Sequence, residues 1–287
     1  MLNHNNIPSA VARSLQRHFP NQRLLGFETT MGGFSNWTQR AVLEGQQLIV
    51  KAASNPHKRL DLRREASALQ NLLGIGLPIA PLYALDEYEH TSVALLGYLP
   101  GVNGLRLLEQ QSPSISTLYQ QLAQCLAQLH ASPLPQHPLL AEPIAQRAST
   151  AFAQAEHRIP AALQAVLVDG LQALHELPTI HLIHGDPGAH NLLWDGKLTA
   201  LLDWEWAGAG HALIDLAWLK WTLRFRKLGE EIWNAICVGY GTMPAADEGL
   251  MQRLAFGQMA AIIARLNDQP TARTEWLRRV AWTANHQ

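Results

Sequence analysis

The chain has 287 residues, a formal net charge of −1, and 47% hydrophobic and 16% charged residues. These values are typical of a globular protein long enough to bury a sizeable core, and they exclude a largely disordered chain. The Lys and Arg residues are scattered and form no basic patch, so we expect no nucleic acid as a partner.

The first residues have neither a basic start nor an apolar segment, and no run of eighteen apolar residues occurs anywhere. The sequence therefore predicts no signal peptide, no membrane-spanning helix and no membrane partner. Cys125 and Cys237 are far apart and lie in helical patterns, which favours reduced thiols buried in the core. We expect a cytoplasmic protein, and the oligomeric state stays open.

Hydrophobic periodicity predicts a helix over 7–18, followed by a strand-rich region from 24 to about 98. A helical pattern over 60–73 interrupts these strands. The dipeptide Pro100-Gly101 then marks the passage to a larger, mainly helical region.

In that second region, leucines at helical spacing predict a long amphipathic helix that begins near Ser114 or Ser116. A proline-rich segment over 133–143 predicts a rigid surface loop. Two helical segments follow over 144–176, and further helices extend from 213 to the end of the chain.

Three short strands separate these groups of helices. They are predicted over 179–183, 191–194 and 198–202. The dipeptide Asp195-Gly196 between the last two is a strong signal for a two-residue hairpin turn.

The hairpin turn has a consequence for the polar residues around it. A two-residue turn would pair Leu192 with Thr199 and would bring Asp203 level with Gly188. The hairpin therefore returns Asp203 to the loop that follows the first short strand.

That loop carries Asp186 and Asn191. Together with Asp203, they are the residue types needed to accept a hydroxyl proton and to hold Mg²⁺ in phosphoryl transfer. Mg²⁺ is usually held by one or two carboxylates together with substrate phosphates, so Asn191 and Asp203 suffice as protein ligands. Asp186 then remains as the catalytic base.

The spacing His-x-Asp-x4-Asn, followed by two hydrophobic residues and Asp, resembles the catalytic core of the aminoglycoside phosphotransferase and choline kinase family. The resemblance covers about 30–219 and includes, in order, Gly32-Gly33-Phe34-Ser35-Asn36-Trp37-Thr38, Leu48-Ile49-Val50-Lys51, Arg63-Arg64-Glu65-Ala66 and Gly97-Tyr98-Leu99-Pro100-Gly101. It implies an α+β, bilobal, protein-kinase-like fold. A small antiparallel sheet with one main helix would form a nucleotide-binding lobe over 1–99, and a helical catalytic and substrate-binding lobe would span 100–287.

The resemblance also implies how ATP is held. Lys51 would contact the α and β phosphates and pair with Glu65, on the helix that follows the strand break at Asn55-Pro56. The backbone of a hinge at 96–100 would meet the adenine. The implied nucleotide-binding residues are Gly32, Gly33, Ser35, Asn36, Lys51, Glu65, Gly97 and Leu99. A preference for ATP over GTP stays open.

Five residues near the catalytic loop have supporting or open roles. His184 is expected to orient the loop through hydrogen bonds, since no second His or Cys stands at metal-ligand spacing. Asp215 either supports the loop, as the resemblance implies, or is a first-turn helix carboxylate. The chain departs from the family pattern at Pro187 and His190. The roles of His190 and Glu205 stay open.

The resemblance implies a kinase that transfers the γ-phosphoryl group of ATP, with Mg²⁺, to a hydroxyl of a small molecule such as choline, ethanolamine, thiamine, an amino-sugar or an aminoglycoside. Tryptophan faces bind cations, although Trp218 and Trp221, three residues apart, are more typical of a core. Carboxylates in the same half favour a cationic over a neutral acceptor: Glu205, Asp247, Glu248, Asp268 and Glu275.

Two other classes of protein fit the sequence less well. A protein kinase has an Ala-Pro-Glu motif after its metal-binding Asp, whereas here only eleven residues lie between Asp203 and Asp215 and no Ala-Pro-Glu occurs. A catalytically weak nucleotide-binding regulator is expected to have lost one of the four key residues. All four are present: Lys51, Asp186, Asn191 and Asp203.

Overall fold

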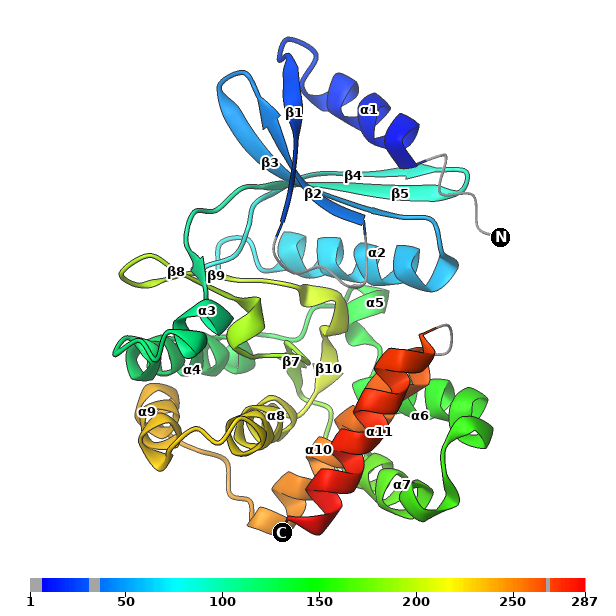
Figure 1. Cartoon of the computed structure of the whole chain (residues 1–287), viewed down its shortest axis with the longest axis vertical. Helices are drawn as coiled ribbons and strands as arrows, with labels where there is room; N and C mark the ends of the chain where they lie inside the picture. Colours follow the sequence, from blue (N-terminus) through cyan, green and yellow to red (C-terminus); the bar gives the residue numbers. More distant parts are fainter. Residues whose placement is uncertain (1–6, 31–36, 267–268, 287) are drawn as a thin grey trace. The chain divides into compact units, whose positions relative to one another are not determined.

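A computed structural model describes residues 7–30, 37–266 and 269–286 (Figure 1). Its five-stranded antiparallel sheet and the mainly helical remainder confirm the α+β class. No helix in these three ranges has both the length and the apolar character that a membrane crossing requires.

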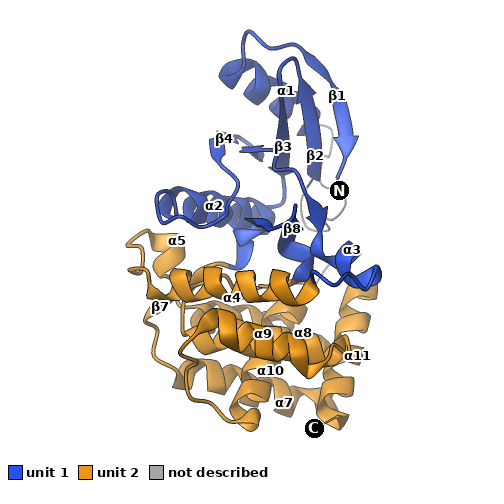
Figure 2. Cartoon of the chain, turned by 90° about the vertical axis from the view of Figure 1, so that its left-hand side faces the viewer, with its two compact units in different colours: residues 1–114, 189–206 blue, residues 115–188, 207–287 orange. Residues whose placement is uncertain are grey.

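The chain divides into two compact units (Figure 2). Unit 1 comprises Met1–Ser114 and Ala189–Trp206, and unit 2 comprises Ile115–Gly188 and Ala207–Gln287. The chain therefore leaves unit 1, forms part of unit 2, and returns to unit 1 for the predicted hairpin. The lobe boundary expected between 99 and 100 stays a prediction.

The large sheet of unit 1 has the strand order β1-β2-β3-β5-β4, and all neighbouring strands are antiparallel. Its strands are Leu24–Thr29 (β1), Trp37–Leu43 (β2), Gln46–Ala53 (β3), Leu82–Tyr88 (β4) and Thr91–Gly97 (β5). Two-residue turns join β2 to β3 and β4 to β5. These strands confirm the strand-rich region predicted from 24 to about 98.

Side chains of β3 alternate between the two faces of the sheet. Leu48 and Val50 are buried in one cluster with α1 (Ile7–His18), whose bounds match the predicted helix. Burial of side chains of this size contributes roughly 1.5 to 3 kcal/mol each. Lys51 follows Val50 and therefore lies on the opposite face of the sheet. There its ammonium contacts Glu65 of α2 (Pro56–Asn71).

Helix α2 begins at Pro56, four residues before the helical pattern predicted over 60–73. Asn55 is its N-cap, and the Asn55 side-chain oxygen accepts a hydrogen bond of 2.9 Å from the backbone nitrogen of His57. Proline is favoured at the first helical position because it lacks an N–H that would have no partner inside the helix. The Asn-Pro pair thus ends the strand and starts the helix.

A smaller three-stranded sheet completes unit 1, with the strand order β6-β8-β9. The remaining elements of unit 1 are Val102–Asn103 (β6), Gly104–Glu109 (α3), Ala189–Asn191 (η3), Leu192–Trp194 (β8), Leu198–Leu201 (β9) and Trp204–Trp206 (η4). Strands β8 and β9 form the hairpin that the sequence predicts.

The predicted register of this hairpin is wrong. Leu192 pairs with Leu201 rather than with Thr199, and the register shifts between Leu193 and Trp194. The physical reason is a wider turn, which contains a backbone hydrogen bond of 2.9 Å from the nitrogen of Asp195 to the oxygen of Lys197. Continued by two residues, the observed register brings 203 level with 190 rather than with 188.

Unit 2 is mainly helical, and its elements confirm the helices predicted over 144–176 and from 213 onward. They are Ile115–Ala131 (α4), Pro138–Ala141 (α5), Ile144–Ala155 (α6), Glu156–Arg158 (η2), Ala161–Glu176 (α7), His181–Ile183 (β7), Gly208–Gly210 (β10), Ala212–Phe225 (α8), Glu230–Tyr240 (α9), Glu248–Arg265 (α10) and Pro270–Asn285 (α11). The short helix α5 interrupts the segment predicted as a rigid loop. Strands β7 and β10 pair antiparallel.

Close helix packing holds unit 2 together. A Cβ atom at Gly170 of α7 would lie 2.3 Å from the backbone nitrogen of Gly257 of α10, so only glycine permits this approach. Leu122 and Leu126 of α4 are fully buried.

Cys125, one position before Leu126, is a free and partly exposed thiol. The expectation that this thiol is buried in the core is therefore wrong, because the buried stripe of an amphipathic helix covers only part of its surface.

Candidate active site

In unit 1 the predicted pair between Lys51 and Glu65 is confirmed. The Lys51 ammonium donates hydrogen bonds of 2.7 and 2.8 Å to the two Glu65 oxygens. Strand alternation places Lys51 on the α2 face of the sheet, and Glu65 lies in the middle of that helix. Both side chains are largely buried, so the pair is a charge-assisted contact shielded from most of the solvent.

The Lys51 ammonium also donates a hydrogen bond of 3.1 Å to Oδ1 of Asp203. Asp203 has a φ of +62°, a left-handed conformation that is uncommon for a residue other than glycine. Strained backbone of this kind persists only where the surrounding structure imposes it, and it concentrates at functional positions. The side chain of Asp203 remains 34% exposed.

The residues after Asp203 hold the same cluster. The backbone N–H of Trp204 donates a hydrogen bond to Glu65, and the Trp204 ring is fully buried. Glu205, whose role the sequence leaves open, is buried and adds negative charge near Lys51. Burial opposes the charge on Lys51, but the carboxylates of Asp203, Glu65 and Glu205 outweigh it and raise the pKa of the ammonium above its usual range.

The hairpin places Asn191 near Asp203 in the fold of unit 1. The backbone nitrogen of Leu202 donates to the carbonyl oxygen of Asn191 at 2.8 Å, directly before Asp203 in the chain. Asn103 anchors the preceding turn, since its side-chain nitrogen donates to the His190 carbonyl oxygen at 2.8 Å. The sequence leaves the role of His190 open, and this contact involves only its backbone.

The oxygen atoms of Asn191 and Asp203 have the chemistry that Mg²⁺ prefers. Among the residues with a described placement, no group of three or more His, Cys, Asp or Glu side chains has an arrangement that could hold a metal ion. A closed protein cage is not what Mg²⁺ requires, because it usually keeps waters and binds substrate phosphates alongside one or two protein ligands. The donor set therefore fits a magnesium ion that arrives with a nucleotide.

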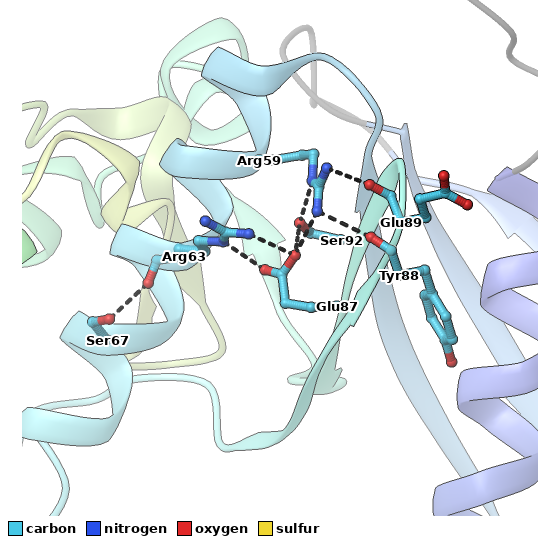
Figure 3. Close-up of polar contacts among 7 residues, drawn as sticks. All are labelled: Arg59, Arg63, Ser67, Glu87, Tyr88, Glu89 and Ser92. Atoms are coloured by element: carbon cyan, nitrogen blue, oxygen red, sulfur yellow. Dashed lines mark hydrogen bonds and ion pairs between the residues drawn. The ribbon is translucent and has the colours of Figure 1, made fainter.

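A polar network fixes α2 against the hairpin of β4 and β5 (Figure 3). Arg63 donates to both carboxylate oxygens of Glu87, at 2.7 and 2.9 Å, and Arg59 and Ser92 donate to one of them. Burial opposes the ionisation of Glu87, but these hydrogen bonds outweigh it and lower the pKa of Glu87 to about 2. Since Glu65 lies on the same helix, the network also helps to hold its position.

The other predicted nucleotide-binding residues belong to the glycine loop and to the hinge, and the structure describes only the hinge. Gly32, Gly33, Ser35 and Asn36 lie outside the described residues. Gly97 ends β5 opposite Leu48, and its nitrogen donates to the carbonyl oxygen of Pro81 at 2.8 Å. A Cβ atom on Gly97 would lie 2.5 Å from the Pro81 ring. Leu99 is partly exposed beyond the strand end.

In unit 2, Asp186 lies in the loop after β7. Its backbone nitrogen donates to Nδ1 of His184 at 3.2 Å. His184 is fully buried. The expected hydrogen bond between His184 and the loop is therefore present, and the orienting role of this histidine stays a prediction.

Asp215 of α8 supports the same loop. Its two oxygens accept hydrogen bonds of 2.8 Å from the backbone nitrogens of His184 and Gly185, and Oδ2 also accepts from Nε2 of His130 at 3.0 Å. Burial opposes the charge of this fully buried carboxylate. Its hydrogen bonds with the His130 side chain and with the backbone nitrogen of His184 outweigh burial and lower the pKa of Asp215. Asp215 is thus in the first turn of a helix and is also bonded to the loop.

Sequence reasoning missed the contact between Trp218 and Asp186. The indole nitrogen of Trp218 donates to Oδ1 of Asp186 at 2.7 Å. The available signal was the spacing, since Trp218 follows Asp215 by three residues and therefore lies on the same side of α8. The core interpretation of Trp218 and Trp221 is confirmed, because both rings are buried.

The structure brings the predicted residues together in two groups. In unit 1 these are Lys51, Glu65, Asn191 and Asp203, and in unit 2 these are His184, Asp186 and Asp215. An antiparallel sheet with a buried Lys–Glu pair, followed by a helix-supported His-x-Asp loop, defines a kinase-like phosphotransferase.

Residues 28–256 match the phosphotransferase enzyme family. The chain belongs to this family, whose members include small-molecule kinases. None of the curated proteins matches the chain significantly in sequence.

Solved structures of the family are similar in fold. An aminoglycoside-3'-phosphotransferase of type VIII is 20% identical, with a TM-score of 0.69 over 90% of this chain and 100% of that one. Choline kinase LicA from Streptococcus pneumoniae is 16% identical, with a TM-score of 0.72 over 98% of this chain and 100% of that one. A mutant aminoglycoside phosphotransferase, in a ternary complex with ADP and hygromycin B, is 15% identical, with a TM-score of 0.70 over 96% and 98%.

Proposed function

We propose that this protein transfers the γ-phosphoryl group of ATP, with Mg²⁺, to a hydroxyl group of a small cationic molecule. The observation that carries the proposal is the buried Lys51–Glu65 pair, with Asp203 hydrogen-bonded to the same ammonium. A lysine held in this way presents a fixed positive charge beside a metal-binding carboxylate, as phosphoryl transfer requires.

The nucleotide is assigned to the residues of unit 1. Lys51 would contact the α and β phosphates, and Glu65 would keep its ammonium in place. The proposal also includes a glycine loop with Gly32 and Gly33 and a hinge with Gly97 and Leu99. Both stay predictions. Complexes of relatives with ADP support a nucleotide as the phosphoryl donor.

Asn191 and Asp203 would hold Mg²⁺. When bound, this ion neutralises charge on the phosphates. Asp186 is the proposed general base. It would accept the proton of the acceptor hydroxyl while the hydroxyl oxygen bonds to the γ phosphorus and the bond from that phosphorus to the oxygen of ADP breaks.

A cationic acceptor is the finer part of the proposal. It is supported by the acceptors that the names of two relatives give. One relative is a choline kinase and the other is an aminoglycoside phosphotransferase, and both acceptors carry amine-derived cations. The carboxylates expected to receive the cation have other contacts: Glu248 pairs with Lys220, Glu275 pairs with Arg278 and Arg279, and Asp247 caps α10. Asp268 lies outside the described residues. Glu248, Glu275 and Asp247 are therefore already engaged by protein groups, and the acceptors of the relatives support this part of the proposal.

The test is ADP production by the full chain with ATP and Mg²⁺ against choline, ethanolamine, thiamine, kanamycin and glucosamine, with glucose as the uncharged control. Mass spectrometry of the products identifies the phosphorylated hydroxyl. We expect a higher kcat/KM for at least one amine-bearing alcohol than for glucose. A preference for glucose would overturn the cationic acceptor and leave the phosphotransferase assignment in place. The expected cytoplasmic location and the absence of nucleic-acid and membrane partners stay predictions.

A further inference from the structure

We propose that Trp218 is a positioning residue for the base Asp186, and this inference rests on the proposed function. The 2.7 Å hydrogen bond from the indole nitrogen to Oδ1 of Asp186 carries it. The donor faces a carboxylate, and hydrogen bonds to ionised acceptors are shorter and stronger than neutral ones. Only 3% of Trp218 is exposed, so water does not readily replace this donor.

One helix holds the catalytic loop at two places. Asp215 and Trp218 are three residues apart on α8, so their side chains leave the helix on neighbouring positions of one face. Asp215 accepts hydrogen bonds from the backbone nitrogens of His184 and Gly185. Trp218 donates to the side chain of Asp186, which follows Gly185 in the chain. The helix therefore sets both the path of the loop and the orientation of its carboxylate.

The indole of Trp218 is itself held by stacking. Its ring centroid lies 4.6 Å from that of Trp221, with an interplanar angle of 27°, and 5.9 Å from that of Trp276, with an angle of 21°. Rotation of Trp218 would break both stacks. The N–H group therefore points in one direction, as a donor that orients a reacting group must.

The same stack argues against a cation-binding role for these rings. Arg279 lies over the ring of Trp276, with 4.5 Å between its guanidinium carbon and the ring centroid. A protein cation thus already lies over one ring of the stack, and the rings otherwise pack on one another. The stacked rings therefore pack against one another rather than around a cationic ligand.

A fixed carboxylate matters because the terminal torsion of Asp has a broad energy minimum. The hydrogen bond to Oδ1 restricts rotation about this torsion and sets the carboxylate plane. Small misorientations of a catalytic group reduce the rate strongly, even when substrates still bind. Loss of the donor is therefore expected to lower kcat and to leave the KM for ATP unchanged.

The chain offers a matched control. Trp221 is in the same stack, one turn further along α8, but its indole nitrogen donates to Oγ1 of Thr283 at 2.9 Å. Trp218→Phe and Trp221→Phe each remove one indole N–H and a similar volume from the same aromatic group. Only the first removes the bond to Asp186.

The kinetic experiment compares kcat, the KM for ATP and Tm in the wild type and the two Phe variants, with the acceptor that the panel identifies. We expect Trp218→Phe to lower kcat about 10-fold or more, with an unchanged KM for ATP and a fall in Tm similar to that of Trp221→Phe. Equal kcat values for the two variants would overturn the proposal.

A second readout does not need activity. Protein labelled with ¹⁵N at tryptophan is compared with the Asp186→Asn variant, and each Phe variant assigns its missing indole N–H resonance. We expect Asp186→Asn to shift the Trp218 resonance much more than that of Trp221. An unchanged Trp218 resonance would overturn the inference. If no acceptor is phosphorylated by the wild type, the proposed function fails and this spectrum alone still decides the Trp218 contact.

Discussion

The ammonium of Lys51 lies 3.1 Å from Oδ1 of Asp203, although 152 positions separate the two residues in the chain. Lys51 is assigned to the negative phosphates of the nucleotide, and Asp203 is assigned to the positive metal ion. In the structure these two side chains are paired with each other. Lys51 is bonded to Glu65 as well, so it would keep a carboxylate partner if Asp203 bound the proposed metal ion.

Asp186→Asn is expected to lower kcat by about 10² to 10⁴-fold, the usual contribution of a general base. The amide cannot accept the hydroxyl proton but has nearly the same shape. Because Asp186 is not assigned to the nucleotide, ATP affinity measured by calorimetry should stay within a factor of about two to three. Near-wild-type turnover in the coupled assay would exclude Asp186 as the base.

Asp203→Ala is expected to weaken ATP binding when Mg²⁺ is present and to leave metal-free binding nearly unchanged, because it removes a proposed metal ligand. Calorimetric titrations with and without Mg²⁺ measure the difference. Asp195→Ala is the matched control, since Asp195 is an exposed carboxylate on the turn of the same hairpin. The same magnesium dependence in wild type and Asp203→Ala would contradict the assignment.

Glu65→Gln is expected to raise the KM for ATP about 10-fold, because a charge-assisted contact contributes on the order of 1.5 to 3 kcal/mol and the amide keeps one acceptor. Steady-state kinetics at saturating acceptor measure this change. The control is Glu44→Gln in the exposed turn between β2 and β3. Equal KM values for the two variants would show that the Lys51–Glu65 pair does not affect the nucleotide.

Glu87→Gln is expected to lower the free energy of unfolding by about 1 kcal/mol near pH 6, since the network is partly exposed. The folded-state pKa of Glu87 is about 2, below its ordinary value of 4.5. Its stabilising contribution is therefore complete above pH 4.5 and is lost as the pH falls towards 2.

Urea unfolding of wild type and Glu87→Gln between pH 6 and pH 2.5 measures this effect. The difference between them should shrink across that range. Glu89→Gln, in the turn of the same hairpin with an exposed side chain, should show no such trend. A pH-independent difference for Glu87→Gln would refute the linkage.

His130→Ala is expected to destabilise the protein by roughly 1 to 3 kcal/mol, because it removes a hydrogen-bond partner from the buried Asp215 carboxylate. His130 bonds to Asp215 through Nε2 and to Tyr240 through Nδ1. The His130→Gln amide extends to the Nε2 position, whereas His130→Asn reaches only the Nδ1 position. Thermal unfolding should therefore show more recovery for Gln than for Asn, and the reverse order would place the main contribution at Tyr240.

The sequence by itself determined the features that depend on short stretches of chain. The period of the apolar residues predicted α1 with its observed bounds, and the Asn55-Pro56 pair indicated where the strand that carries Lys51 ends. The spacing of Asp186 and Asn191 was sufficient to indicate the chemistry, because both residues are in one short loop.

The tertiary structure alone decided which distant groups meet. The hairpin signal at Asp195-Gly196 was correct, but the width of the turn, and with it the register that carries Asp203, depends on packing that no local signal encodes. The periodic apolar pattern predicted that Trp218 is buried. Residue spacing does not determine the direction of its N–H group, because the rotamer of the indole and its hydrogen-bond partner depend on how all the surrounding side chains pack. The bond from Trp218 to Asp186 therefore appears only when the helices of unit 2 have packed.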